Sequence, residues 1–356
     1  MQLYNRRGSG KFQRKQSTGD AHAAGDASKE EQGTVLLINH KVMIEGTLSN
    51  HQQQNFEDKQ RHITGDSIPD RFLDDYGLAV SCKKGLKPES PNQDDFCLLI
   101  DGRNVILGVF DGHGPYGHHV SDHIHALLPR LINKHELLDT DAAAAMTESF
   151  KKAHESLIMH CEHPDTRFDC VISGSTASVL IIRPEEILVG FVGDSRAILS
   201  RKEGEARKVV ILAPDHKPTN PGERERVERS GGEVKKLPFD IPFRVFFKGK
   251  EYPGLSMSRA IGDTMAQEIG VTWMPEVKSF PTTELDEFVI VCSDGVWEFI
   301  SNEEAIALVA NYGKSKVRQA AEQLAKLAWS RWIHNEGETV DDITVLIAFL
   351  PVSRTH

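Results

Sequence analysis

The sequence predicts an α+β fold in which antiparallel sheets are layered with helices. Short apolar runs rich in β-branched residues follow one another across tight turns, which is the pattern of antiparallel strands. Helical periodicity appears in pairs of segments between these runs, whereas repeated βαβ units would alternate single strands with single helices. The chain has 356 residues and no internal repeat, which fits one large domain with a tail.

The elements follow from hydrophobic periodicity in chain order. The strands are expected at Tyr76–Cys82, Phe96–Ile100, Val105–Phe110, Ala177–Ile182, Ile187–Val192, Val209–Leu212, Phe288–Cys292 and Ile343–Leu350. The helices are expected at His118–Asn133, Ala142–Cys161, Glu303–Ala310 and Val317–Ile333.

The first 65 residues are expected to form a largely disordered tail and linker. Up to Thr18 there are five basic and no acidic residues, and such a segment buries too little apolar area to offset its ordering entropy. Organelle transit peptides share this composition, but no apolar face repeats here at helical spacing. An added strand is compatible with residues 35–44, where Val35–Ile38 and Val42–Ile44 are apolar. Residues 66–356 would form the main domain, with a charged flap at about 214–254.

Composition narrows the class of protein. The chain carries 42 Lys and Arg against 52 Asp and Glu, a net charge of −10, which argues against nucleic acid as a partner. Apolar runs fall short of the roughly 18 residues of a membrane helix. The five cysteines form no CxxC pair, which fits reduced thiols inside a cell. We expect a monomeric cytoplasmic or nuclear protein without stable membrane insertion.

Aspartates stand at the ends of several apolar strands. Asp111 follows a strand directly, Asp194 follows a strand and a glycine, Asp294 follows a strand and a serine, and Asp341-Asp342 precede the last strand. An aspartate in such a place is often only a turn residue, but repetition at so many strand ends weakens that interpretation. Oxygen ligands of this kind select Mg²⁺ or Mn²⁺ over zinc, so the pattern indicates a carboxylate metal site.

The register of a predicted hairpin places Asp94 close to these strand-end aspartates. A turn at Asp101–Asn104 would pair Ile100 with Val105, and the same register places Asp94 opposite Asp111. Two opposed carboxylates are destabilising in a sheet, and a cation between them removes the penalty.

Two other motifs suggest different chemistry. Gly112–Gly117 matches GxGxxG, but Asp111 would direct negative charge towards a pyrophosphate, and no second strand carries a ribose-binding acid. His119 and His123 have the spacing of a zinc-binding helix, yet Val120 stands where a metalloprotease needs glutamate. A surface pair of histidines is the preferred interpretation.

Taken in order, eight motifs resemble one family. They are Asn92-Gln93-Asp94, Phe110-Asp111-Gly112-His113-Gly114, Gly174-Ser175-Thr176-Ala177, Gly193-Asp194-Ser195-Arg196, Asp215-His216-Lys217-Pro218, Ser258-Arg259-Ala260-Ile261-Gly262-Asp263, Ser293-Asp294-Gly295-Val296-Trp297 and Asp341-Asp342-Ile343-Thr344. The sequence closely resembles the metal-dependent serine/threonine phosphatases of the PPM (protein phosphatase 2C) family from about Tyr76 to Leu350.

The resemblance implies a β-sandwich of two antiparallel sheets flanked by helix pairs, a four-layer αββα arrangement, with a binuclear Mn²⁺ or Mg²⁺ site at one edge. It implies that Asp111 bridges both ions, that the Gly112 carbonyl ligates one, and that Asp294 and Asp341 hold the other. A weaker third ion would involve Asp194 with Asp294. Asp94 would act through a metal-bound water, and His113 resembles the family's general acid.

The chain departs from the family pattern at three positions. Gln93 stands where glutamate is frequent, which removes one charge. No arginine stands at the family's phosphate-binding place, so the nearest cation, Lys87, is expected to bind phosphate as a point charge. Asp342 replaces a frequent asparagine and is a near alternative to Asp341 as ligand.

The expected activity is hydrolysis of phosphoserine and phosphothreonine in phosphoproteins by metal-activated water. The alternative is a catalytically inactive phosphatase-like scaffold, although every ligand implied by the resemblance is present. A nuclease using the same metals is disfavoured because the chain has no basic stripe.

Overall fold

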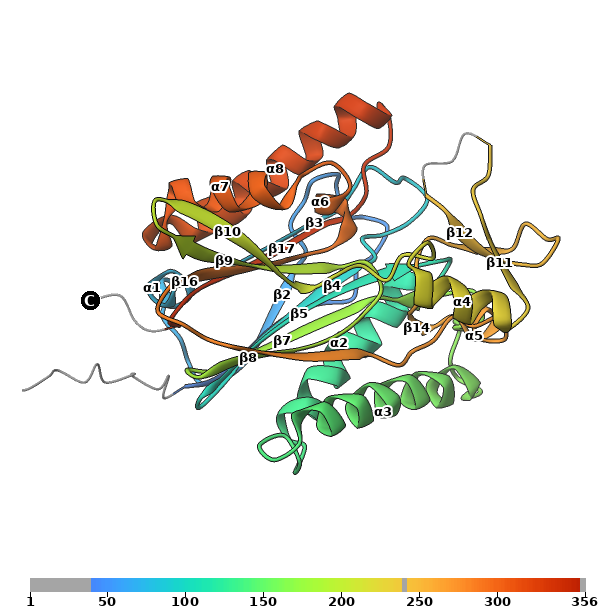
Figure 1. The fold of residues 1–356 in the computed structure, drawn as a ribbon, viewed down its shortest axis with the longest axis horizontal. Coiled ribbons are helices and arrows are strands. Elements are labelled where there is room, and N and C mark those ends of the chain that lie inside the picture. Colours follow the sequence, from blue (N-terminus) through green and yellow to red (C-terminus); the bar gives the residue numbers. More distant parts are fainter. Residues whose placement is uncertain (1–39, 239–241, 353–356) are drawn as a thin grey trace, which may run out of the picture. The chain divides into compact units, whose positions relative to one another are not determined.

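The computed structural model describes residues 40–238 and 242–352. Within these ranges the strands form three antiparallel sheets of nine, five and three strands. The two larger sheets pack face to face, and a pair of helices covers the outer face of each (Figure 1). The predicted four-layer α+β sandwich is confirmed.

The larger sheet is built around the hairpin β4–β5. Its main path runs in the order β15 (Glu276–Pro281), β8 (Glu186–Val192), β7 (Ala177–Ile182), β5 (Asn104–His113), β4 (Asp94–Asp101), β1 (Lys41–Gly46) and β2 (Arg61–Gly65). At the end of β5, two short strands extend the sheet, β6 (Gly174–Ser175) and β14 (Ile261–Gly262).

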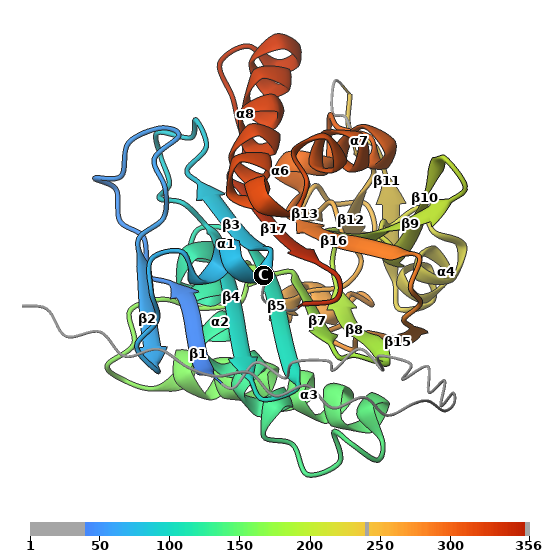
Figure 2. The same ribbon diagram turned by 90° about the vertical axis from the view of Figure 1, so that its left-hand side faces the viewer.

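The second sheet runs in the order β10 (Ala206–Ala213), β9 (Arg196–Glu203), β16 (Asp286–Cys292), β17 (Ile343–Phe349) and β3 (Leu78–Lys83). Helices α2 (Gly117–Asn133) and α3 (Ala142–Glu162) cover the larger sheet, while α7 (Asn302–Tyr312) and α8 (Val317–Glu336) cover the second (Figure 2). The short helical segments are α1 (Phe72–Tyr76), α4 (Pro221–Arg229), α5 (Thr264–Gln267), α6 (Asp294–Trp297) and η1 (Lys314–Lys316).

Three layers of apolar side chains hold this arrangement together. Phe96, Leu107 and Val291 lie between the two sheets and are fully buried. Phe150 and Leu324 belong to the layers beneath the two helix pairs. Because both faces of each sheet are covered, the central strands are apolar at nearly every position, which is why they read as continuous hydrophobic runs.

The N-terminal segment contributes more to the sheet than its composition suggests. Val42–Ile44 lie in β1, whose Val42 pairs with Ile100 of β4 and whose Ile44 pairs with Ile63 of β2. Strand β2 lies in the segment expected to be a linker, and its exposed edge position explains its polar sequence. Residues 35–38 lie outside the described ranges.

Other differences are local. The strand expected from Tyr76 begins at Leu78, because α1 ends at Tyr76 and Gly77 caps it with a φ of 71°. Strands β9 and β15 were not expected, since their sequences mix charged and apolar residues.

The segment expected to be a flap has regular structure of its own. It contains α4 and the three-stranded sheet of β11 (Gly232–Lys235), β12 (Arg244–Phe247) and β13 (Pro253–Leu255). Val227, Val234 and Val245 form its small apolar core together with residues of the following segment. Across the described part of the chain, none of the helices combines the length and apolarity needed to cross a membrane.

Candidate metal centre

The hairpin β4–β5 places two carboxylates directly opposite each other. Ile100 pairs with Val105, and the same register pairs Asp94 with Asp111, so the predicted pairing is confirmed. Asp111 lies within β5 rather than in a turn, because the strand continues and pairs Gly112 with Ser175 of β6. The pair therefore sits where the larger sheet is extended by its two short strands.

Three further carboxylates meet this pair. Asp194 follows β8, Asp294 begins α6 one residue after β16, and Asp341 precedes β17. Burial raises the pKa of Asp111 well above its ordinary value, and the charges of the other four aspartates raise it further. The strand ends of both large sheets thus form one acidic centre, defined here as Asp94, Asp111, Asp194, Asp294 and Asp341.

Several oxygens of the acidic centre have no hydrogen-bond partner within the part of the chain that the structure describes. Oδ1 of Asp94, of Asp194 and of Asp294 is buried without a hydrogen-bond donor among the described residues. Burial and the charge of Asp342 raise the pKa of Asp94 to about 7, and the pKa of Asp294 is raised well above its ordinary value. Buried oxygens without donors are costly unless a cation compensates them, so the donor set fits hard divalent ions.

Asp94 is fixed by two hydroxyl groups. Ser293 Oγ and Thr344 Oγ1 each donate to its Oδ2 over 2.7 Å. Both donors come from the second sheet, one after β16 and one in β17. Oδ1 of Asp94 accepts no hydrogen bond from any residue that the structure describes.

Two ammonium groups lie against the acidic centre. The Lys87 side chain is one quarter exposed and forms an ion pair with Asp341. Lys217 Nζ donates to Asp194 Oδ2 over 2.7 Å. Although burial favours the neutral carboxyl, Lys217 holds the pKa of Asp194 below its ordinary value. Lys217 stands in the motif Asp215-His216-Lys217-Pro218, but the motif by itself does not indicate its contact with Asp194.

Asp342 and Gln93 support the backbone around the centre. Asp342 accepts hydrogen bonds from the backbone N–H groups of Gly85 (2.7 Å) and Gln93 (2.8 Å). Gln93 Nε2 donates to the Gly114 carbonyl over 2.8 Å. At Gly112, a Cβ would lie 2.6 Å from the carbonyl carbon of Gly117, so the position excludes a side chain.

His113 lies beside the acidic centre at the end of β5. Its Nε2 is 2.6 Å from Oδ2 of Asp263, a buried residue 150 positions away in the sequence. Burial by itself would lower the pKa of His113, but the Asp263 carboxylate outweighs it and raises the pKa. No local sequence pattern signals this partnership.

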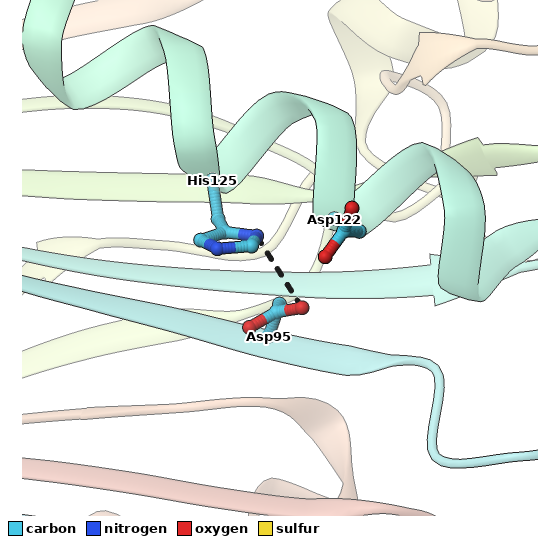
Figure 3. A group of neighbouring side chains, drawn as sticks. All are labelled: Asp95, Asp122 and His125. Atoms are coloured by element: carbon cyan, nitrogen blue, oxygen red, sulfur yellow. Dashed lines mark ion pairs between the residues drawn. The ribbon is translucent and has the colours of Figure 1, made fainter. Parts of the chain in front are cut away.

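A second polar group lies behind β4, on the side of α2. Asp95 of β4 faces Asp122 and His125 of α2, with His125 Nδ1 3.3 Å from Asp95 Oδ2 (Figure 3). Lys59 Nζ lies 2.8 Å from the same oxygen and donates to the Asp94 carbonyl over 2.6 Å. This ammonium already occupies the position of a cation, so we interpret the group as a buried ion pair that supports β4.

In the described ranges, Asp95, Asp122 and His125 form the only group of three such side chains with ligand atoms within 4.8 Å of one another. Among the described residues, His119 and His123 therefore have no third ligand that close. They are not a surface pair, however, because both are partly buried: the His119 ring stacks on Phe168, and His123 Nε2 lies 3.1 Å from Ser156 Oγ. Among the same described residues, no three carboxylate oxygens of the acidic centre lie within that distance of one another.

Comparisons with known proteins agree with this architecture. The family model of protein phosphatase 2C matches residues 92–336. "Probable protein phosphatase 2C 64" of Oryza sativa subsp. japonica is 36% identical over 279 residues, covering 74% of this chain and 64% of that protein. "Probable protein phosphatase 2C 48" of the same organism is 35% identical over 299 residues, covering 76% of this chain and 83% of that protein.

A solved structure has the same fold. The serine-threonine phosphatase 2C of Toxoplasma gondii superimposes with a TM-score of 0.67 at 21% identity, covering 76% of this chain and 94% of that one. The family match spans more than half of the chain and includes most strands of both large sheets and four of the five aspartates of the acidic centre. The chain belongs to the protein phosphatase 2C family of metal-dependent serine/threonine phosphatases.

Proposed function

We propose that this chain hydrolyses phosphoserine and phosphothreonine in phosphoproteins with two Mg²⁺ or Mn²⁺ ions held at the acidic centre. The observation that carries the proposal is the set of three buried carboxylate oxygens, on strand ends from both sheets, that find no donor in the described ranges. Asp111 and the Gly112 carbonyl would hold one ion, and Asp111, Asp294 and Asp341 the other. Asp194 and Asp294 would bind a weaker third ion.

When bound, the ions supply Lewis acidity that activates water and neutralises phosphoryl charge. The protein contributes orientation and protons. Asp94, fixed through its Oδ2, directs Oδ1 towards the attacking water. Lys87 is exposed enough at the edge of the centre to contact a phosphate oxygen. His113 donates a proton to the departing serine or threonine oxygen, which leaves poorly as an alkoxide.

An inactive scaffold is the competing proposal. Such a chain would keep the sandwich and lose ligands, whereas here all five aspartates of the acidic centre are present and interact with one another. A metal-dependent rate therefore distinguishes the two proposals.

The experiment is a phosphopeptide assay of the full chain after treatment with EDTA. Activity should vanish in EDTA and return with Mn²⁺ or Mg²⁺. Asp111→Asn should reduce kcat by about 10³-fold or more, since this carboxylate is assigned to both ions. Asp165→Asn, at an exposed loop position, is the matched control and should leave kcat unchanged. Undiminished activity in excess EDTA would contradict the two-ion proposal, and inactivity under all metal conditions would favour the scaffold.

A further inference from the structure

Asp263 is held in a conformation that few residues adopt. Its φ of 49° and ψ of 45° are left-handed, and its backbone N–H donates to the Ser173 carbonyl over 2.9 Å. The residue is 1% exposed, yet its carboxylate reaches His113 and its Oδ1 has no hydrogen-bond partner among the described residues. A non-glycine residue in this region stores modest strain, so the surrounding structure must impose the position.

Gly174 makes room for the contact between the two side chains. It lies in β6, where it pairs with both His113 and Gly262. A Cβ at Gly174 would collide with Asp263 Oδ2 and lie 2.8 Å from His113 Nε2. The His113–Asp263 contact therefore depends on a missing side chain at a third position.

The geometry divides the two nitrogens of His113 between two tasks. Nε2 is occupied by Asp263, whereas Nδ1 is buried without a hydrogen-bond partner among the described residues. The Asp194 and Asp294 carboxylates also act on the imidazole, so the ring lies against the acidic centre. The nitrogen left without a partner is the one available to a substrate.

We infer that Asp263 is a positioning residue that holds His113 through Nε2–H and leaves Nδ1–H as the proton donor to the departing oxygen. The inference rests on the proposed phosphatase function and deepens it. In the step, water oxygen bonds to phosphorus and releases one proton to solvent while the bond from phosphorus to the serine or threonine oxygen breaks. That oxygen takes the Nδ1 proton, and His113, still protonated at Nε2, regains its lost proton from water.

Leaving-group dependence tests the inference in the metal-loaded enzyme. A nitrophenolate leaves without a proton and a serine alkoxide does not, so Asp263→Asn should slow phosphopeptide hydrolysis by about 10-fold to 10²-fold and nitrophenyl phosphate hydrolysis by less than about 3-fold. His113→Gln should give the same pattern with a larger phosphopeptide loss. Equal losses on both substrates in Asp263→Asn would overturn the inference in favour of a structural role.

Gly174→Ala provides a second variant that leaves both chemical groups intact. Its methyl group should separate His113 from Asp263 and reproduce the selective loss on phosphopeptide. Gly222→Ala is the control, because a Cβ there meets no atom within 4 Å, and it should behave as wild type. A Gly174→Ala enzyme with unchanged phosphopeptide kcat would contradict the need for the contact.

The ring itself can be observed without turnover. In ¹⁵N NMR spectra of the Mg²⁺-loaded protein, neutral His113 should carry its proton on Nε2, and Asp263→Asn should produce a mixture of tautomers. A neutral ring protonated on Nδ1 in wild type would refute the assignment of the nitrogens. A wild-type chain without phosphatase activity but with the Nε2–H tautomer would count against the proposed function and leave the positioning contact standing.

Discussion

Lys217 and Asp194 form a charge-assisted hydrogen bond within the acidic centre, with Nζ donating to Oδ2 over 2.7 Å. Asp194 belongs to the carboxylates proposed to hold the weaker third ion. An ammonium on one of its oxygens competes with a divalent cation for the same negative charge. The Lys217 ammonium thus supplies a physical reason why an ion proposed at that site would bind weakly.

The first prediction is that Lys217→Gln binds a divalent ion more tightly at Asp194. Removal of the competing charge should increase the affinity of the weakest Mn²⁺ site by about 10-fold, measured by isothermal titration calorimetry. Lys208→Gln removes the same charge from an exposed position of β10 and should leave Mn²⁺ affinity unaltered. Identical titrations for the two variants would show that Lys217 does not compete with the ion.

The second prediction concerns pH and the stability of the chelated protein. A carboxyl whose pKa is higher folded than unfolded stabilises the fold at low pH, and this stabilisation is lost as pH rises through the folded pKa. Burial raises the pKa of Asp94 to about 7, and it raises the pKa of Asp111 and of Asp294 well above the ordinary value. In EDTA, unfolding free energy should fall above pH 6.5, by up to about 1.4 kcal/mol per pH unit for each such carboxyl.

The lower limit of that pH window follows from the partly buried His123 and the buried His154. Burial lowers the pKa of His123 and His154 to about 4, so their effect, a gain of stability with rising pH, is complete near pH 6.5. Denaturant titrations at pH 6.5, 7.25 and 8.0 would measure the slope, and Mg²⁺ should flatten it. Asp111→Asn should stabilise the chelated protein at pH 8.0, and a steeper loss of stability in this variant would contradict the account.

The third prediction separates the tail from the sheet. Deletion of residues 1–39 should leave turnover of an aryl phosphate within a few-fold, because this part has the composition of a tail over most of its length. Deletion of residues 1–50 also removes β1, whose buried Val42, Met43 and Ile44 contribute roughly 5 kcal/mol or more together. That protein should be insoluble or unfolded by circular dichroism, and a folded, active 51–356 fragment would show that β1 is dispensable.

The fourth prediction tests the ion pair behind β4. Lys59→Met leaves the buried Asp95 carboxylate without its ammonium partner and should cost about 3–5 kcal/mol of unfolding free energy. The double variant Lys59→Met/Asp95→Leu removes both charges and should recover most of that loss. Chemical denaturation of the four proteins gives the coupling energy, and additive losses would show that the two groups act independently.

Local signals in the sequence are sufficient to predict the β4–β5 hairpin and the opposition of Asp94 and Asp111 that follows from it. The turn at Asp101–Asn104 and the apolar runs beside it fix the register that opposes Asp94 and Asp111. This prediction succeeds because strand pairing across a short turn propagates residue by residue.

Side-chain contacts between residues far apart in the chain have no comparable signal in the sequence. His113 and Asp263 meet because β14 pairs with β6, which in turn pairs with β5. No local sequence pattern predicts this strand order. Lys59 stands in a polar, glutamine-rich stretch whose composition is typical of a linker, yet it is 2% exposed. The energetic role of a lysine such as Lys59 depends on which carboxylate the fold brings close to it. The residues next to it in the sequence do not specify that carboxylate.

The acidic centre draws its carboxylates from both sheets, which makes the apolar layer between them a spacer for an ionic site. Val109 lies two residues before Asp111 and Val291 three before Asp294, and both side chains pack in that layer. The thickness of this apolar layer therefore sets the distance between the aspartate oxygens that the two sheets contribute, although those oxygens lie outside the layer. Removal of a methyl group from Val109 or Val291 would therefore change the affinity of the acidic centre for ions without replacing any of its aspartates.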